Sequence, residues 1–511
     1  MRGCGILFPV FSIPSKYGIG SFSKEAFDFV DFLKRSGQGF WQILPIGPTG
    51  YSNSPYQAIS SFAGNPDLIS LEELIEEGFL TRDEVERVNF GSDPEKADYG
   101  ALYEGRKSLL KVAAQRVKES FSEDKDLKEG FDAFKKEEDY WLKDYCLYSA
   151  IKEANENKPW FEWDEGLKER KDNALKAAVK EYEEEIENET IIQFLFLRQW
   201  TKLHKYAKKN NVSIIGDLPF FAAPDSADVW ANKNAFKLDS DLKPAFSAGT
   251  PPDAFSPKGQ IWKMPVYDWD AEKKSGYSFW LSRFRKYFEL FDLIRIDHFH
   301  GFSECYEIPF EDEDGQNGKS VKGPGAELFE KVFKTYGKGK LIAEDLGNVT
   351  KENEELLEET AIPGMNILEY AFTSWDSKYM THRQVRNSVV YTGNHDNTPL
   401  RAWVEDIGEG SRDFLRRYVN SINTDYGKLT WDIIREAYRS VAFLSIVPLY
   451  DYLVMGREAR LNTPGTDAGN WQWRLRPNLL SADLERSIRD LAETYCRLPQ
   501  EIKEEDGEPK E

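Results

Sequence analysis

An arginine and an aspartate two positions apart are the first residues in this sequence that could do chemistry. They are Arg295 and Asp297, near the end of an apolar run in the segment 291–301, which then breaks at a His-Phe-His-Gly turn. Because side chains on one face of a strand recur at every second residue, these two are expected on the same face. A neighbouring cation keeps a carboxylate ionised and oriented, as a nucleophile requires. A structural ion pair at a strand end is the alternative interpretation.

Three more carboxylates stand at the ends of short apolar runs. They are Asp217, Glu344 and Asp396, and His395 directly precedes the last of them. If these runs are strands of one barrel, their carboxyl ends meet at one rim. Four carboxylates on one rim repel one another unless a site uses them, so the pattern indicates function. Clustered carboxylates without cysteine or histidine ligands fit either a divalent metal site or glycoside chemistry.

The residue types around these carboxylates favour a sugar. Neither a glycine-rich phosphate loop nor a lysine at a strand end accompanies them, and His298 and His300 are not part of an HxxxH or HExxH pattern. Aromatic residues make up 14% of the chain, including 14 tryptophans. Aromatic rings pack on the C–H face of a pyranose while carboxylate, arginine and histidine groups bond to its hydroxyls. We therefore predict glycoside chemistry without a metal ion.

Charge and composition narrow the range of partners. The 511 residues include 67 Lys and Arg against 88 Asp and Glu, a formal net charge of −21, which disfavours nucleic acid and anionic membranes as partners. No apolar run approaches the ~20 residues of a membrane-spanning helix. Pro9 interrupts the apolar segment 5–13, which lacks a cleavage site, so no signal peptide is expected. The four scattered cysteines indicate free thiols in a reducing compartment, and we predict a cytoplasmic protein.

Eight apolar runs, with helical stretches between most of them, define the predicted fold. An eightfold alternation of strands and helices predicts a (β/α)₈ TIM barrel. An open doubly wound sheet is the alternative, but no GxGxxG follows the first strand. The predicted strands begin near Phe40, Asp67, Val212, Phe291, Leu341, Met365, Val389 and Ala442.

The segment 72–211 differs in texture from the rest of the chain. Its long charged helical stretches and sparse glycine predict a helical insertion. Residues 1–71 would then form the first part of the barrel and 212–498 the remainder, followed by an acidic, disordered tail at 499–511. Two long loops without regular periodicity are predicted, an aromatic lid or binding loop at 247–269 and a glycine-rich, charged loop at 311–325.

Nine short motifs run through the chain in order. They are WQILP (41–45), SPY (54–56), FAGNP (62–66), GDLP (216–219), RIDHF (295–299), AEDLG (343–347), HDN (395–397), NTPG (462–465) and NWQWR (470–474). Together they resemble the 4-α-glucanotransferases called amylomaltases or disproportionating enzymes, of the glycoside hydrolase family 77 type. The resemblance implies a barrel with helical insertions, no separate C-terminal β-domain, no required metal and no cofactor.

The same resemblance implies roles for individual residues. Asp297 resembles the family's nucleophile, Glu344 its general acid/base and Asp396 its transition-state stabiliser. The chain departs from the family's pattern at His300, Asn394, Thr398 and Tyr450. The positions that resemble substrate-binding residues are Ser54, Tyr56, Asp217, Arg295, His395, Asp253, Trp262 and Asn462.

A retaining transfer reaction follows from these roles. Segments of an α-1,4-glucan donor would pass through a covalent glycosyl-aspartate to the 4-hydroxyl of glucose or a maltooligosaccharide. An α-amylase-like hydrolase is the alternative enzyme, and a non-catalytic glucan-binding protein is the alternative of another class. We expect a monomer or a weak homo-oligomer.

Overall fold

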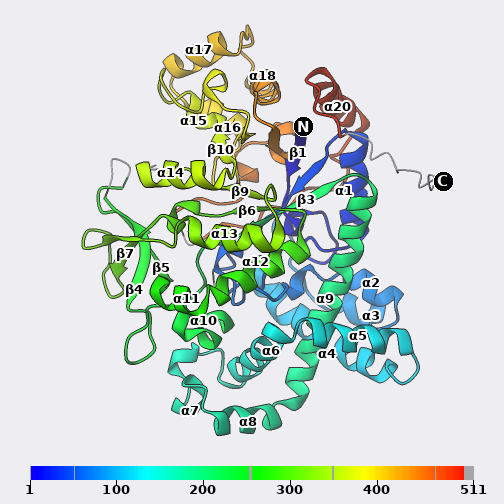
Figure 1. The fold of residues 1–511 in the computed structure, drawn as a ribbon. Coiled ribbons are helices and arrows are strands. Elements are labelled where there is room, and N and C mark those ends of the chain that lie inside the picture. The colour runs from blue at the N-terminus through cyan, green and yellow to red at the C-terminus, as the bar shows by residue number, and fades with distance from the viewer. Residues whose placement is uncertain (1, 51, 253–255, 348–349, 467, 500–511) are drawn as a thin grey trace, which may run out of the picture.

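Eight parallel strands form a barrel at the centre of the molecule (Figure 1). The computed structural model describes residues 2–50, 52–252, 256–347, 350–466 and 468–499. The Ala343 amide donates to the Pro363 carbonyl at 2.9 Å, which joins the two ends of the sheet. The predicted (β/α)₈ barrel is thereby confirmed. The order around it is β10 (Gly364–Ile367), β11 (Ser388–Tyr391), β12 (Leu444–Pro448), β1 (Gly3–Leu7), β2 (Phe40–Gln42), β3 (Ser213–Leu218), β6 (Leu293–Ile296) and β9 (Leu341–Ala343), all neighbours parallel.

One of the eight predicted strands is wrong. The segment Asp67–Leu71 holds a 3₁₀ turn, η3 (Pro66–Leu68), and the first residue of helix α2 (Leu71–Glu76). The side chains of Asn65 and Ser70 accept hydrogen bonds from backbone amides of these two elements. Such N-caps, with proline in the first turn, start helical turns rather than strands.

The strand that replaces it is β1, at the very start of the barrel sequence. Gly5 in β1 lies so close to β2 that a Cβ atom there would be 2.4 Å from the Phe40 carbonyl oxygen. A strand with two glycines that is buried against both neighbours lacks the polar–apolar alternation by which strands are recognised. The predicted number of strands was therefore right although one member was misplaced.

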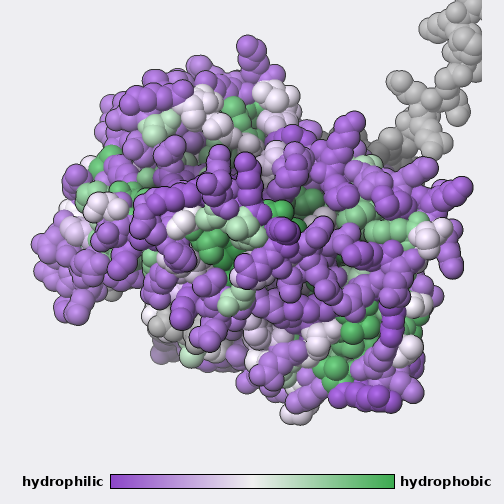
Figure 2. Space-filling model, turned by 90° about the horizontal axis from the view of Figure 1, so that it is seen from below, coloured by the Kyte–Doolittle hydropathy of each residue, from purple (hydrophilic) through white to green (hydrophobic). Residues whose placement is uncertain are grey.

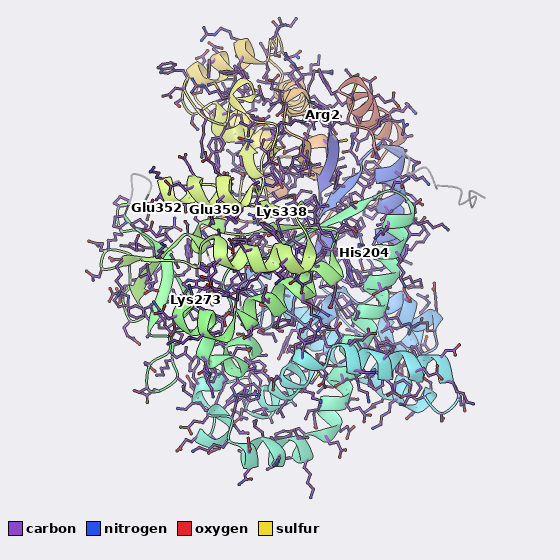
Figure 3. All side chains as sticks on the ribbon, in the orientation of Figure 1. Arg2, His204, Lys273, Lys338, Glu352 and Glu359 are labelled. Atoms are coloured by element: carbon purple, nitrogen blue, oxygen red, sulfur yellow. The ribbon has the colours of Figure 1, made fainter. Side chains whose placement is uncertain are left out.

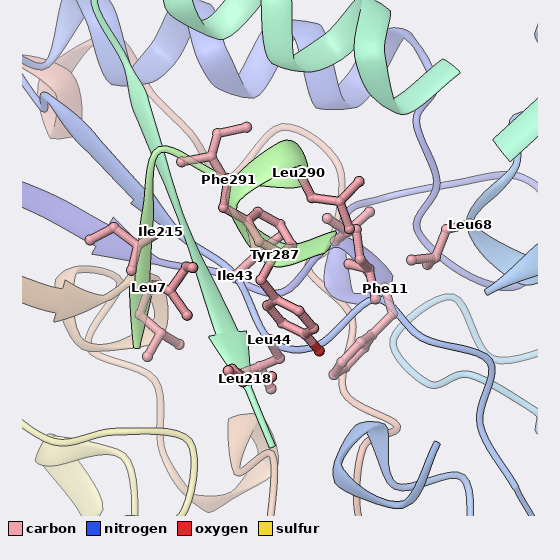
Figure 4. Close-up of a cluster of buried hydrophobic side chains, with 14 of the residues drawn as sticks. Leu7, Phe11, Ile43, Leu44, Leu68, Ile215, Leu218, Tyr287, Leu290 and Phe291 are labelled. Carbon is pink, nitrogen blue, oxygen red and sulfur yellow. The ribbon is translucent and has the colours of Figure 1, made fainter. Parts of the chain in front are cut away.

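Hydrophobic packing below the rim fixes the strand that carries Arg295. Leu7 and Ile215 of the barrel belong to one buried cluster with Tyr287, Leu290 and Phe291 (Figure 4). Tyr287 and Leu290 lie on helix α12 (Ser278–Leu290), which runs directly into β6. Each fully buried large apolar side chain contributes about 1.5–3 kcal/mol relative to an exposed one. The position of β6 is thus set by the core.

Helices occupy the chain between β2 and β3. The last of them, α9, packs on the barrel through Trp200, whose ring lies 5.6 Å from that of Phe291, and through His204, 2.9 Å from Asp292 (Figure 3). Seen from below the view of Figure 1, the surface of the molecule is mostly hydrophilic with small hydrophobic patches (Figure 2). The helices after α2 are α3 (Arg82–Glu86), α4 (Tyr99–Ser120), α5 (Lys125–Glu137), α6 (Asp139–Ala154), α7 (Glu165–Lys168), α8 (Asp172–Glu181) and α9 (Glu183–Lys209).

A second, antiparallel sheet stands beside the barrel. Its strand order is β5 (Gln260–Pro265), β4 (Phe246–Thr250), β7 (Glu304–Pro309) and β8 (Lys319–Lys322). The prediction of irregular loops at 247–269 and 311–325 is therefore wrong where these strands lie. The strands β4 and β7 are far apart in sequence, so their pairing is not a local signal. Asp253 lies outside the described residues, as does the predicted disordered tail from residue 500 onward.

The remaining helices surround the barrel. Lys273 on α11 pairs with Glu327 on α13 at 2.5 Å (Figure 3). In the part of the chain that is described, no strand follows β12 and no helix is long and apolar enough to cross a membrane. These helices are α1 (Lys24–Arg35), α10 (Ala227–Ala231), α11 (Trp269–Ser275), α13 (Ala326–Tyr336), α14 (Lys351–Thr360), α15 (Leu368–Ala371), α16 (Leu400–Asp406), α17 (Glu409–Tyr418), α18 (Tyr426–Arg439), α19 (Leu449–Tyr452) and α20 (Ala482–Thr494).

Candidate active site

The barrel brings the four predicted carboxylates to the carboxyl ends of its strands. Asp217 lies within β3 and is paired in register with Arg295 of β6. Asp297 and Glu344 each follow the last residue of a strand, β6 and β9, and Asp396 lies in the loop after β11. Since parallel strands share one direction, all four belong to the same rim.

Arg295 binds two of these carboxylates at once. Its Nη1 lies 2.6 Å from Asp217 Oδ1 and 3.2 Å from Asp297 Oδ1. The Arg295 and Asp217 side chains are buried, whereas the Asp297 side chain is 26% exposed and reaches the rim. Asp217 also accepts a hydrogen bond from the Tyr56 hydroxyl at 2.9 Å. The predicted pairing of Arg295 with Asp297 is confirmed, and Asp217 holds the arginine from below.

Glu344 lies next to Asp297 and is held by the backbone. The His298 amide donates to Glu344 Oε2 at 2.7 Å, and His298 adopts the left-handed conformation, φ 46°. Burial raises the pKa of Glu344 to about 7, with a contribution from the Asp297 charge and against that of Arg295. Burial also raises the pKa of Asp297 to about 6, although Arg295 opposes it. This pair of carboxyl groups can share one proton near neutral pH.

Asp396 has the opposite electrostatic environment. It accepts a hydrogen bond from Asn462 Nδ2 at 2.6 Å, and its second carboxylate oxygen lies 3.3 Å from His395 Nε2. Burial by itself would raise the pKa of Asp396. The charge of His395 and the two hydrogen-bond donors outweigh it and hold that pKa well below its usual range. Asp396 therefore stays ionised under conditions in which Glu344 carries a proton.

Aromatic rings form one wall beside these groups. Tyr56, on the 3₁₀ turn η2 (Pro55–Gln57), stacks on His395 with ring centres 4.9 Å apart and an interplanar angle of 18°. Trp471 lies 5.8 Å from the Tyr56 ring and 5.9 Å from the His395 ring. Ser54 caps η2 by accepting the Tyr56 amide at 3.3 Å. Ser54 thus holds Tyr56, and its predicted contact with the substrate stays a prediction.

Comparison with known proteins identifies the family. The sequence model of a family described as 4-alpha-glucanotransferase matches residues 8–481. This chain belongs to the 4-alpha-glucanotransferase family. It is accordingly a glycosyltransferase that acts on α-1,4-glucans.

Individual members of the family match this glucanotransferase over nearly its whole length. The 4-alpha-glucanotransferase of Streptococcus pneumoniae is 41% identical over 504 residues, 98% of each chain. That of Aquifex aeolicus is 43% identical over 478 residues, 93% of this chain and 96% of the other. The solved structure of an amylomaltase from Streptococcus agalactiae in complex with acarbose has a TM-score of 0.93 at 35% identity, covering 97% of this chain and 100% of that one.

Two aromatic residues of the glucanotransferase site lie where the sequence did not place them. Trp471 was recognised only as part of the NWQWR motif, and that motif was the one available signal for it. Trp262, predicted in an irregular loop, lies on β5 with its ring 5.0 Å from that of His298, edge to face. Trp262 thus packs on His298, the residue that follows Asp297 and whose amide binds Glu344.

Asn462, His298 and His300 each have a specific contact near the catalytic carboxylates. Asn462, a predicted substrate-binding residue, contacts Asp396 directly, and its contact with the substrate stays a prediction. His298 packs against Phe221, and burial lowers its pKa to about 3. His300 Nε2 lies 3.0 Å from the Leu346 carbonyl oxygen. Among the described residues, no group of three or more His, Cys, Asp or Glu side chains could hold a metal ion.

The loop that carries His395 and Asp396 is anchored by a residue that sequence reasoning missed. Asp451, on α19, accepts from Thr392 Oγ1 at 2.6 Å and from the Leu400 amide at 2.8 Å. These donors stand at the two ends of the loop. A buried carboxylate thus fixes the loop that presents the ionised Asp396.

Replacing Asp451 by alanine should loosen this loop. Two buried donors would lose their acceptor, at about 1–3 kcal/mol each, so the free energy of unfolding should fall by about 2–6 kcal/mol. We expect kcat for maltotriose to fall more than KM rises. Asp451→Asn keeps an acceptor oxygen for the Leu400 amide, and its Nδ2 can donate to the Thr392 hydroxyl, so it should recover part of both losses. A kcat for Asp451→Ala equal to that of the parent protein would contradict the anchoring role.

Proposed function

We propose that this protein transfers segments of α-1,4-glucan to the 4-hydroxyl of glucose or of another glucan by a retaining double displacement. Asp297 is the nucleophile, Glu344 the general acid and base, and Asp396 the stabiliser of the transition state. The observation that carries the proposal is that three carboxylates on one rim have three different environments. One is oriented by Arg295, one is protonatable near pH 7, and one is held ionised.

The first displacement breaks the glycosidic bond. An Asp297 oxygen attacks the anomeric carbon while protonated Glu344 gives its proton to the departing oxygen. The bond between the anomeric carbon and Asp297 forms as the bond to the leaving sugar breaks. The shortened donor leaves with a new hydroxyl, and Glu344 is left ionised. The hydrogen bond from the His298 amide stabilises Glu344 in that state.

The second displacement returns the enzyme to its starting state. Ionised Glu344 takes the proton of an acceptor 4-hydroxyl, whose oxygen attacks the anomeric carbon and releases Asp297. Two inversions at one carbon restore the α configuration. Ionised Asp396, opposite the positive charge that develops on the sugar ring, stabilises both transition states.

The reaction should have a bell-shaped dependence on pH. The free enzyme must have Asp297 ionised and Glu344 protonated. With pKa values of about 6 and about 7 for the two groups, kcat/KM should rise as Asp297 loses its proton and fall as Glu344 loses its own, with a maximum between them. The two groups titrate as a pair, so both limbs belong to the dyad. The test is the rate of glucose release from maltotriose, measured from about pH 4 to about pH 9. A maximum above about pH 8, roughly one unit above the pKa of Glu344, would count against the assignment.

Whether sugar or water accepts the glycosyl group depends on the aromatic rings around the site, among them Trp262, which packs on His298. Rings that cover the site exclude water and offer an acceptor sugar a face on which to stack. Trp262→Ala should therefore raise the ratio of hydrolysis to transfer by about fivefold, the equivalent of ~1 kcal/mol of ring contact. Trp375→Ala, at a ring that is 79% exposed, is the matched control and should leave the ratio unchanged. An unchanged ratio in Trp262→Ala as well would remove that residue from the acceptor site.

Incubation of the protein with maltotriose alone tests the proposed function. Transfer gives free glucose together with a ladder of longer glucans. Glucose and maltose with nothing longer would mean that water is the acceptor, and the protein would be a hydrolase. No reaction would favour a glucan-binding protein without catalysis.

A cytoplasmic location fits the four free cysteines, three of them buried, and a monomer or weak homo-oligomer remains our prediction.

A further inference from the structure

A half-buried arginine, Arg460, binds three oxygen atoms around Asp396. Its Nε donates to the Asn462 carbonyl at 2.9 Å, its Nη1 to Thr398 Oγ1 at 2.9 Å, and its Nη2 to the Asp396 carbonyl at 3.4 Å. Arg460 directly follows the 3₁₀ turn η8 (Arg457–Ala459). It has no part in the mechanism proposed above.

Arg460 donates only to uncharged oxygens within the part of the chain that is described. Arg457, on the preceding turn, is instead 57% exposed and pairs with Asp406. A guanidinium offers five donors in a fixed plane and can therefore hold several acceptors at once. The charge of Arg460 acts at longer range on Glu369. Burial and the charge of Asp451 raise the pKa of Glu369 well above its usual range, and Arg460 opposes this.

Two separate segments of the chain meet at Asp396. Its carboxylate is 38% exposed, so packing alone does not fix it, and Oδ1 accepts from Asn462 Nδ2 at 2.6 Å. Between residues 394–398 and residues 460–462, the described chain has no backbone–backbone hydrogen bond. Arg460 binds oxygens of both segments at once. It thereby sets how far Asn462 stands from Asp396.

Thr398 supplies the contact that attaches the guanidinium to the Asp396 loop most closely. It is one of the positions at which this chain departs from the family's pattern, and its Oγ1 lies 2.9 Å from Arg460 Nη1. Asp451 holds the two ends of the loop, whereas Arg460 holds it at and just after Asp396. The two residues thus restrain different parts of the loop.

We propose that Arg460 is a positioning residue for the transfer reaction, which holds Asn462 against Asp396 and so keeps the Asp396 carboxylate where positive charge develops on the sugar. The inference rests on the proposed function for the role of Asp396. A displacement of about 1 Å in an active site can lower a rate by about 10²-fold. Because Asp396 acts in the transition state, the effect belongs to kcat rather than to KM.

Arg460→Ala should lower kcat for maltotriose by about 10²-fold and change KM by less than about threefold. The loss should be as large with α-maltosyl fluoride, whose fluoride leaves without a proton, because Asp396 acts with either leaving group. Arg457→Ala is the matched control, because its side chain is exposed and pairs with Asp406. It should keep the kcat of the parent. A parental kcat in Arg460→Ala would overturn the proposal.

Chemical rescue separates positioning from a folding defect or a need for charge alone. Millimolar guanidinium chloride should raise the kcat of Arg460→Ala about tenfold, because the ion offers the same planar donors to the same oxygens. Ammonium chloride at equal concentration carries the charge without the fork and should not. Equal rescue by both salts would mean that the charge acts, as on Glu369, and would overturn the proposal. Rescue by neither salt would make Arg460 a structural residue and would also overturn it.

A milder variant leaves the arginine in place. Thr398→Val removes one acceptor and should lower kcat about fivefold at an unchanged KM, whereas Thr398→Ser keeps the oxygen and should match the parent. Equal kcat in these two variants would count against the contact. All rates are measured as glucose release. A parent that released glucose without longer glucans would therefore refute transfer, and the comparison would still decide the role of Arg460. A parent that released none would refute both.

Discussion

Asp297→Asn should lower the turnover of maltotriose by at least ~10⁴-fold, because it removes the atom that forms the covalent bond to the sugar. Binding of glucans should persist, since Arg295 keeps its 2.6 Å contact with Asp217. The measurement is the rate of glucose release per molecule of folded protein. A merely glucan-binding protein would show little change beyond one lost contact.

The matched control lies at the opposite end of the same strand. Asp292 precedes β6 and accepts hydrogen bonds from His204 and from the Ile214 amide, each at 2.9 Å. Asp292→Asn should lower Tm and leave the turnover of folded protein within about threefold of the parent. If both variants lost turnover equally, the effect of Asp297→Asn would have to be structural rather than chemical.

The stability of Asp297→Asn should also depend on pH in a defined direction. Burial raises the pKa of Asp297 to about 6 in the folded protein, above the ~3.9 of an unfolded chain. Ionisation therefore opposes folding, and this cost develops as the pH rises from the unfolded pKa through the folded one. At about pH 8, two units above the folded-state pKa, the variant should therefore have a higher Tm than the parent. Near pH 4, close to the unfolded-state pKa of ~3.9, the two Tm values should differ little.

Glu344→Gln should lower kcat for maltotriose by about 10²–10⁴-fold through loss of the proton donor. The loss should be smaller for the formation of the intermediate from α-maltosyl fluoride, because fluoride leaves without a proton. The intermediate should then accumulate on Asp297 and be detected as a gain in protein mass. Azide, which needs no general base, should restore turnover and give an α-configured glycosyl azide, because both inversions still occur.

Comparing maltotriose with α-maltosyl fluoride distinguishes the loss of a proton donor from general damage to the site. If Glu344→Gln were impaired equally with maltotriose and with the fluoride, Glu344 would not be the acid. Thr360→Ser is a suitable control for the preparation, because Thr360 is buried on α14, and a serine hydroxyl can keep its bonds to the Leu356 carbonyl and the Ile362 amide. It should behave as the parent does with both donors.

The sequence by itself determined the features that depend on near neighbours in the chain. The two-residue spacing of Arg295 and Asp297 could be read as one face of a strand, and the structure has them in contact at 3.2 Å. The helix 24–35 has a local apolar periodicity and forms with those bounds. Carboxylates directly after apolar runs could be assigned to strand ends, since the strand direction follows from a repeating strand–helix pattern.

Only the tertiary structure decided which distant residues meet. The contact of Asn462 with Asp396, the anchoring of Thr392 by Asp451, and the position of Trp471 beside Tyr56 all join residues that are remote in sequence. No local period encodes such contacts, because they arise when eight strands close into a ring and bring separate loops to one rim. The same holds for β1, whose glycines pack between β2 and β12, because β12 lies near the other end of the chain. The sequence identifies each carboxylate separately, but only closure of the barrel gives them the different neighbours that set their different pKa values.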